Sequence, residues 1–98
     1  MVFKTAGNKS NPVILFFHAM GVTGESSMPV AEKMAGKYYC IMPTSTVYCS
    51  GQRYHSKRDE IQQIVRFLEN YGIKAIELVV ASSIGADLAM AFVMWYNT

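Results

Sequence analysis

Two serines stand between an apolar run and an alanine-rich segment late in the chain, in VVASSIGADLAMAF at 79–92. The β-branched residues at its start indicate a buried strand, and the apolar spacing after Ile84 indicates a helix. Of the two hydroxyls, only that of Ser83 has small residues both two positions before it and two positions after it, Ala81 and Gly85. This small-x-Ser-x-Gly pattern is typical of a sharp strand-to-helix turn that presents a serine nucleophile, because strand and helix backbones nearly touch there.

The helix expected after this turn would supply favourable electrostatics for acyl transfer. Its N-terminus carries free backbone N–H groups and a partial positive charge. These groups would face the point where negative charge develops on the substrate. The backbone N–H of Ile84 is therefore an expected oxyanion donor, with Ser83 as the nucleophile. Serines between a strand and a helix also serve as plain capping and packing residues, so the motif alone leaves both interpretations open.

A second segment, LFFHAMG at 15–21, favours the catalytic interpretation. A histidine directly follows an apolar run, and small residues follow the histidine. A carbonyl oxygen bound above Ser83 needs a second N–H donor from the loop of a neighbouring strand, and the N–H of Met20 would supply it. A lone histidine at a strand end is more often structural than catalytic, so we expect the ring of His18 to brace this loop.

The elements that must position these residues alternate between strands and helices, which predicts an α/β sheet. Residues 2–6 form a weak strand candidate. Three apolar runs predict strands buried on both faces, at 13–17, 38–42 and 75–80. Capping and periodicity predict three helices, at about 27–36, 57–71 and 84–96. This order of elements makes the last three strands parallel, joined by right-handed crossovers.

The expected helices differ in how much of their surface is apolar. Ser56 can cap the middle helix together with Asp59, and Gly72 can end it. Its apolar residues recur three and four positions apart: Ile61, Ile64, Val65, Leu68 and Tyr71. The last helix is apolar nearly all round, which predicts that it is buried.

The segments GNKSNPVILFFHAMGVTG and LVVASSIGADLAMAF together resemble the α/β-hydrolase family, in particular its small esterase- or lipase-like members. The likeness covers nearly the whole chain but only the first part of the family's fold. It implies a single domain, 1–98, holding a partial sheet of about four mostly parallel strands and about three helices in three α/β/α layers. It also implies a serine hydrolase of carboxylic esters, with Ser83 as nucleophile, the N–H groups of Met20 and Ile84 as oxyanion donors, and neither metal nor cofactor.

The chain departs from the family pattern at several points. Where the family commonly has glycine, this chain has Ala19 and Ala81. The family's triad follows the chain order serine, acid, histidine, and no strand is expected after Tyr96 to carry the last two. His55 would have to serve in an order that the family does not use. We therefore expect the chain alone to lack a complete triad and to be inactive by itself.

The edge of the expected sheet suggests how the fold is completed. Strand 75–80 would expose ladder groups and apolar side chains, which form a template for pairing with another chain. Two copies could pair through this edge, or a missing C-terminal half could complete the sheet. The alternative to an enzyme is a non-catalytic half-fold module that self-associates through the same edge. A flavodoxin-like binding domain is a third possibility, but it would need a phosphate-binding loop that the sequence does not show.

Composition narrows the remaining classes of function. A chain that is 51% hydrophobic and 16% charged suits an interior piece of a larger fold or a subunit that buries a face. The net charge of +2 is spread along the chain, so nothing indicates a nucleic-acid partner.

Charged residues and cysteines bear on where the protein is found. Glu77 and Asp87 argue against a membrane span over 76–96, because a charge inside a membrane is costly. Asp87 is instead expected at a helix N-terminus, where a carboxylate is favourable. Cys40 and Cys49 form no metal or disulfide pattern, which favours a cytoplasmic protein with reduced thiols.

Overall fold

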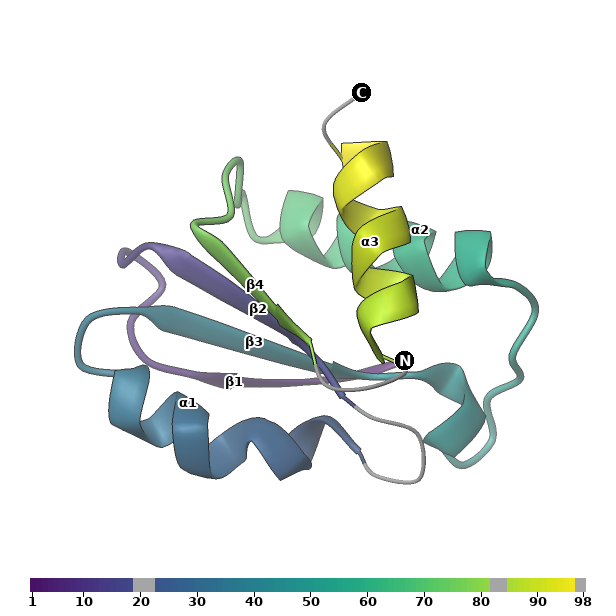
Figure 1. The fold of residues 1–98 in the computed structure, drawn as a ribbon, viewed down its shortest axis with the longest axis horizontal. Coiled ribbons are helices and arrows are strands. Elements are labelled where there is room, and N and C mark those ends of the chain that lie inside the picture. The colour runs from purple at the N-terminus through teal and green to yellow at the C-terminus, as the bar shows by residue number, and fades with distance from the viewer. Residues whose placement is uncertain (19–22, 82–84, 97–98) are drawn as a thin grey trace.

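The computed structural model describes residues 1–18, 23–81 and 85–96. Within them the elements follow in the predicted order: β1 (Val2–Ala6), β2 (Val13–Phe17), α1 (Met28–Met34), β3 (Tyr39–Thr44), α2 (Lys57–Asn70), β4 (Leu78–Ala81) and α3 (Gly85–Tyr96). Two short 3-10 helices, η1 (Gly24–Ser27) and η2 (Thr46–Tyr48), precede α1 and follow β3. Figure 1 shows the arrangement of these elements.

The four strands form one mixed, mostly parallel sheet with the order β1-β3-β2-β4. Strand β2 runs parallel to both of its neighbours, with Leu15 opposite Ile41 on β3 and opposite Val79 on β4. Strand β1 is antiparallel to β3 and closes the other edge. The predicted parallel arrangement of the last three strands is therefore confirmed, and β4 lies at an edge of the described sheet.

Helices cover both faces of the sheet, which confirms the three-layer architecture (Figure 1). Because successive strand side chains point to opposite faces, alternate residues of β2 enter different layers. Leu15 and Phe17 pack in one core with residues of α2 and α3. Ile14 and Phe16 pack in a second core with Ala31 of α1. A strand covered on both faces in this way needs a continuous apolar run, which VILFF supplies.

Helix α2 begins and ends close to the predicted residues. The Ser56 hydroxyl accepts a hydrogen bond from the Asp59 N–H at 3.0 Å, as a capping residue should. Gly72, just beyond the helix, has a φ of 69° that favours glycine. The predicted apolar stripe is buried at Ile61, Ile64 and Leu68. Tyr71 instead lies on the surface, where its ring packs at 4.6 Å from that of Phe67.

Helix α1 is shorter than the predicted 27–36. The preceding residues form η1, and the Ser27 side chain makes no capping hydrogen bond. At the other end, the N–H groups of Lys37 and Tyr38 both turn back to the Met34 carbonyl. This turn ends the helix and directs the chain into β3.

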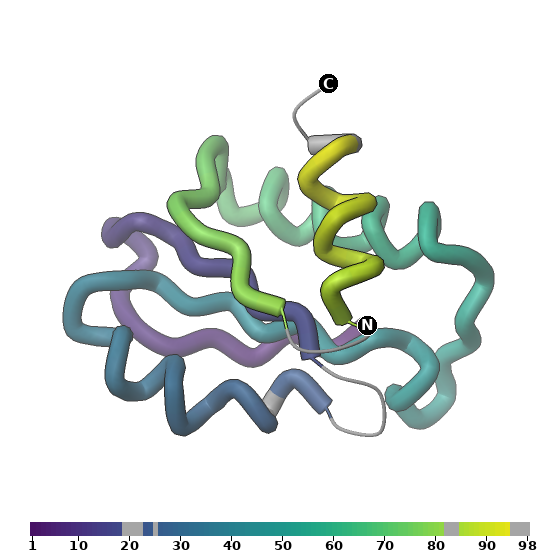
Figure 2. Tube along the Cα trace, in the orientation of Figure 1, coloured from purple at the N-terminus to yellow at the C-terminus, as the bar shows by residue number. Residues whose placement is uncertain are grey.

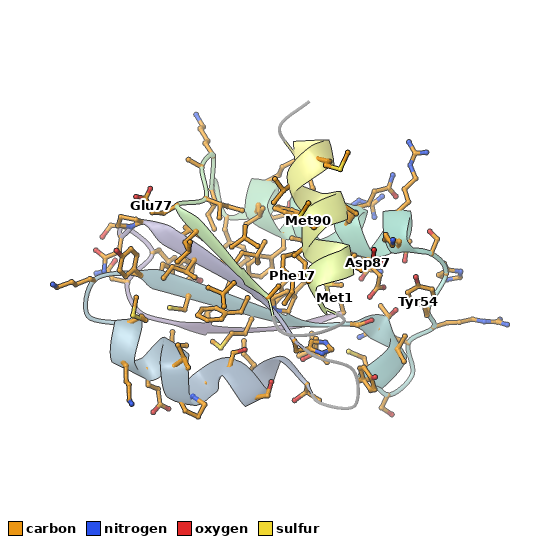
Figure 3. The ribbon with its side chains drawn as sticks, in the orientation of Figure 1. Met1, Phe17, Tyr54, Glu77, Asp87 and Met90 are labelled. Atoms are coloured by element: carbon orange, nitrogen blue, oxygen red, sulfur yellow. The ribbon has the colours of Figure 1, made fainter. Side chains whose placement is uncertain are left out.

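Strand β4 and helix α3 depart most from the sequence expectations. Strand β4 begins at Leu78 rather than at residue 75. Its partner β2 begins at Val13, and Ile14, the second residue of β2, is opposite Leu78, so β2 has no residues to pair with 75 and 76. Helix α3 is not buried all round. Phe92 is buried, whereas Met90 and Met94 are 62% and 68% exposed. Figure 2 traces α3 beside β4, and Figure 3 shows the Met90 side chain on this helix.

Among the helices in the described ranges, none combines the length and the apolar composition that crossing a membrane requires.

Candidate functional site

The predicted nucleophile and oxyanion donors, Ser83, Ile84 and Met20, lie outside the described residues. The residues that flank their two segments are described and lie close together. Phe17 at the end of β2 is opposite Ala81 at the end of β4 in parallel register. Because parallel strands that end in register leave the sheet at the same edge, the two segments start side by side.

Gly85, the first residue of α3, lies very close to the backbone at the end of β2. A Cβ atom on Gly85 would lie 2.5 Å from the His18 carbonyl oxygen and 2.9 Å from that of Phe17. Real side chains do not tolerate such contacts with backbone, so this position requires glycine. The sequence argument that a small residue must follow the serine by two positions therefore has a direct physical basis here.

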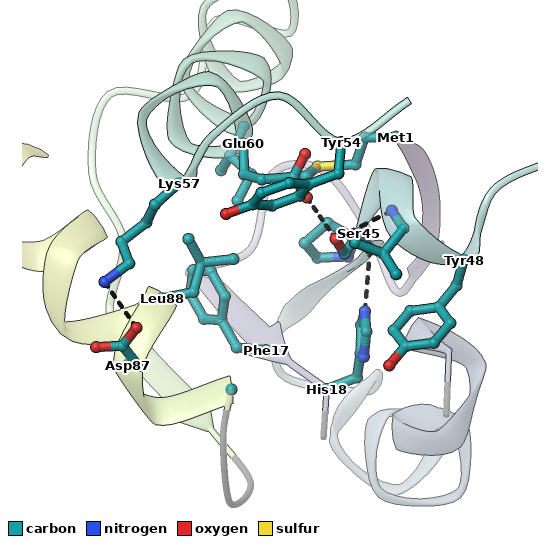
Figure 4. A pocket seen from close by; sticks show the side chains of 14 residues that line it. Met1, Phe17, His18, Ser45, Tyr48, Tyr54, Lys57, Glu60, Asp87 and Leu88 are labelled. Atoms are coloured by element: carbon teal, nitrogen blue, oxygen red, sulfur yellow. Dashed lines mark hydrogen bonds and ion pairs between the residues drawn. The ribbon is translucent and has the colours of Figure 1, made fainter. Parts of the chain in front are cut away.

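A pocket of about 220 Å³ opens beside this contact. Figure 4 shows it between the end of β2, the segment after β3, and the first turns of α2 and α3. The apolar side chains of Phe17, Ile64 and Leu88 form part of its wall, and Tyr54 lies at the side of α2. A mainly apolar pocket with a few polar groups is the usual form of a small-molecule site.

The ring of His18 lies against the segment that follows β3. Its Nε2 accepts a hydrogen bond from the Ser45 N–H at 3.0 Å, and its ring meets that of Tyr48 edge-on at 5.6 Å between centroids. An imidazole that accepts at Nε2 carries its proton on Nδ1. The predicted structural role of His18 thus has a defined contact, which is to the segment that follows β3.

Glu60 is a residue of this site that the sequence analysis missed. It is 1% exposed on α2, and its carboxylate accepts hydrogen bonds from the Ser45 hydroxyl at 2.5 Å, the Thr46 hydroxyl at 2.6 Å and the Thr46 N–H at 3.1 Å. A signal was available, because Glu60 stands four residues before Ile64 and eight before Leu68, on the buried stripe of α2.

Two further charged groups connect the starts of α2 and α3. Lys57 Nζ lies 2.7 Å from the Asp87 carboxylate across the pocket mouth (Figure 4), with the side chains 46% and 68% exposed. Asp87 is in the first turn of α3, where a carboxylate is favourable. At this exposure the pair contributes about 0–1 kcal/mol to stability.

His55, the alternative base considered from sequence, is exposed before α2 and does not belong to the described residues that line the pocket. Among the described side chains, no three of the types His, Cys, Asp and Glu gather closely enough to hold a metal ion.

Comparisons with known proteins agree with this geometry at the level of the fold. No protein-family model and no curated protein matches the sequence. Among solved structures, an α/β-hydrolase family protein from Desulfitobacterium hafniense matches with a TM-score of 0.86 and 15% identity, over 98% of this chain and 40% of its own. The thioesterase domain of the curacin biosynthetic pathway matches at 0.81 and 23% identity, over 97% and 37% of the two chains.

A reconstructed ancestral haloalkane dehalogenase gives a similar result, with a TM-score of 0.79 and 20% identity, over 98% of this chain and 34% of its own. The chain thus spans about a third of the length of the solved structures that it matches. These identities are too low to transfer an activity, but the topological agreement extends over almost every residue. The chain therefore has the fold of the N-terminal portion of the α/β-hydrolases.

Proposed function

We propose that Ser83 is the nucleophile of a serine hydrolase that acts on carboxylic esters, with the N–H groups of Met20 and Ile84 as its oxyanion donors. The observation that carries this proposal is the contact of Gly85 with the Phe17 and His18 carbonyls at the mouth of the apolar pocket. It requires the small residue of the serine motif where α3 meets the end of β2, beside a pocket that could hold part of a substrate.

In this mechanism the Ser83 hydroxyl oxygen attacks the ester carbonyl carbon and loses its proton to a base. The tetrahedral oxyanion is stabilised by the two N–H donors and collapses to expel the alcohol, which takes up the proton. Water then attacks the acyl-enzyme by the same route and releases the carboxylic acid. No metal and no cofactor is required for these steps.

The base and its orienting acid are proposed to come from a polypeptide segment beyond the described fold. Nε2 of His18 already accepts the Ser45 N–H, so using it as a base would cost that hydrogen bond. The chain also spans only about a third of the solved structures that it matches. A serine without its base is a weak nucleophile, so the chain alone should show only the slow reactivity that an oxyanion hole provides.

Labelling with a fluorophosphonate tests the nucleophile directly. Intact mass is measured for the folded wild-type chain, for Ser83→Ala and for the matched neighbour Ser82→Ala, with and without added imidazole as an external base. We expect slow labelling of the wild type and of Ser82→Ala that imidazole accelerates, and none of Ser83→Ala. A folded chain that stays unlabelled at high imidazole, or that is labelled equally in Ser83→Ala, would contradict the proposal.

A second candidate function is self-association of the half-fold through the β4 edge. It is favoured by the exposure of Leu78, which is 48% exposed on β4 although the strand is apolar. Such an edge presents backbone groups to an incoming strand. A sedimentation measurement that finds a stable monomer at high concentration would argue against this candidate.

A further inference from the structure

The carboxylate of Glu60 occupies a place where apolar residues are expected. It is among the largest fully buried side chains, on the stripe of α2 that contains Ile64 and Leu68. Burying a carboxylate is costly unless hydrogen bonds replace its hydration. Here those bonds come from a single short stretch of chain, the turn that follows β3.

Three donors from two consecutive residues hold this turn. Thr46 donates both its N–H and its hydroxyl, and Ser45 donates its hydroxyl, so both carboxylate oxygens are used. Charge-assisted bonds of this kind are the stronger class of hydrogen bond. The Ser45 backbone N–H is then directed away from α2 and donates to the ring of His18 (Figure 4). One residue thus links the Glu60 carboxylate to the His18 imidazole.

His18 is consequently held from two sides. Its ring accepts a hydrogen bond from Ser45, and its carbonyl oxygen faces Gly85 at the start of α3 with too little space between them for a Cβ atom. Met20, the proposed donor, follows only two residues later in the sequence. An oxyanion donor must lie within about 2.7–3.1 Å of the developing charge to be effective. A displacement of His18 would therefore weaken transition-state stabilisation more than it weakens substrate binding.

We propose that Glu60 is a positioning residue of this hydrolase, which fixes the end of β2 and the start of the oxyanion segment through Ser45, Thr46 and His18. Glu60 does not touch the reacting atoms and takes no proton in this role. The inference rests on the proposed function, and the experiment that tests it gives different results when the positioning role fails and when the hydrolase function fails.

The experiment compares Glu60→Gln with Glu69→Gln, an exposed glutamate on the same helix. Glutamine keeps the shape of the side chain but places a donor NH₂ against the Ser45 and Thr46 donors. Three quantities are measured: the free energy of unfolding, the ¹⁵N resonances of the His18 ring and the Ser45 amide, and the imidazole-assisted rate of Ser83 labelling. We expect Glu60→Gln to shift the His18 and Ser45 resonances and to lower the labelling rate at least tenfold, and Glu69→Gln to match the wild type.

Two weaker variants serve where Glu60→Gln does not fold. Ser45→Ala removes one donor and keeps the backbone N–H, and Thr46→Val removes another at nearly constant shape. Both should give smaller shifts at His18 and smaller losses of labelling rate. Unchanged His18 resonances in a folded Glu60→Gln, or in both weaker variants, would overturn the inference.

Labelling and spectra also distinguish the two proposals from each other. Equal labelling rates in the wild type and Glu60→Gln would overturn the positioning role and leave the hydrolase proposal intact. A wild-type chain that is never labelled at Ser83 would overturn the hydrolase proposal, and with it the role given to Glu60 in catalysis, even if the His18 resonances shift.

Discussion

Strands β2 and β4 lie side by side, and both are apolar, yet their surroundings differ. Every residue of β2 is buried, whereas Leu78 and Ala81 at the ends of β4 are exposed and the two valines between them are half-buried. The cause is the order of the sheet, in which β2 has a strand on each side and β4 has one. The apolar residues of β4 therefore form a surface against which another segment or another chain could pack.

Helix α3 repeats this contrast between its two faces. Phe92 packs against Phe17 in the core, with ring centroids 5.8 Å apart, whereas Met94 is 68% exposed. Leu78 of β4 and Val93 of α3 line one pocket of about 360 Å³, so these two exposed side chains lie near each other. Both proposed modes of completing the fold, by a further segment or by a second copy, would use this surface.

The largest expected effect is on the free energy of unfolding, when a leucine is truncated to alanine in each of the two strands. Leu15→Ala on β2 should lower the free energy of unfolding by about 2–5 kcal/mol, because it empties a fully buried site. Leu78→Ala on β4 should cost about 1 kcal/mol or less, since the leucine is already half in water. Urea unfolding of both variants measures the difference. Equal losses would show that β4 is covered in solution.

A second prediction concerns the contact between α3 and the end of β2. Gly85→Ala should destabilise the fold by about 1–3 kcal/mol, because the added methyl meets two carbonyl oxygens that cannot move independently. Gly36→Ala is the matched control, since a Cβ there meets nothing within 4 Å. It should leave stability within about 1 kcal/mol of the wild type. Unfolding curves for the two variants measure this difference in stability. A Gly85→Ala variant as stable as the wild type would refute the close approach of α3 to the end of β2.

A third prediction tests the exposed face itself. If copies of the chain associate through β4 and α3, Leu78→Lys combined with Met94→Lys should weaken association at least tenfold, which is about 1.4 kcal/mol. Val30→Lys on α1 is the control, because Val30 is 54% exposed on the opposite side of the sheet. Sedimentation velocity over a concentration series gives the dissociation constants. Equal effects of the charged residues on both sides would exclude a specific interface at β4.

The smallest expected effect is a difference in the rate of alkylation between the two cysteines, Cys40 and Cys49. Burial raises the pKa of the Cys40 thiol on the interior strand β3, whereas Cys49 is partly exposed in the segment before α2. Because the thiolate is the reactive form, iodoacetamide at pH 8 should modify Cys49 first and Cys40 only on unfolding. A raised folded-state pKa leaves stability unchanged below the unfolded thiol's pKa and lowers it as the pH rises above that value. Peptide mapping over time would reveal any early reaction at Cys40.

Much of the fold could be predicted because its signals are local. The run VILFF, the Ser56 cap and the stripe of Ile61, Ile64 and Leu68 depend on neighbours within one or two turns of chain. The order of strands and helices followed from them, and the three layers followed from that order. The serine motif and the need for a small residue at Gly85 were also visible in the sequence, although Ser83, Met20 and Ile84 remain predictions.

What the sequence could not decide depends on contacts between distant segments. It placed Glu60 on a helix but could not show that the carboxylate is buried, because its donors, Ser45 and Thr46, come from the turn after β3. It placed His18 at a strand end but could not identify Ser45 as its partner.

The sequence by itself determined that β4 and α3 are apolar, since hydrophobicity is a property of each side chain. Which of their residues are covered was decided only by the tertiary structure. Burial depends on the position of a strand within the sheet order, and that order arises from pairing between segments that are far apart along the chain.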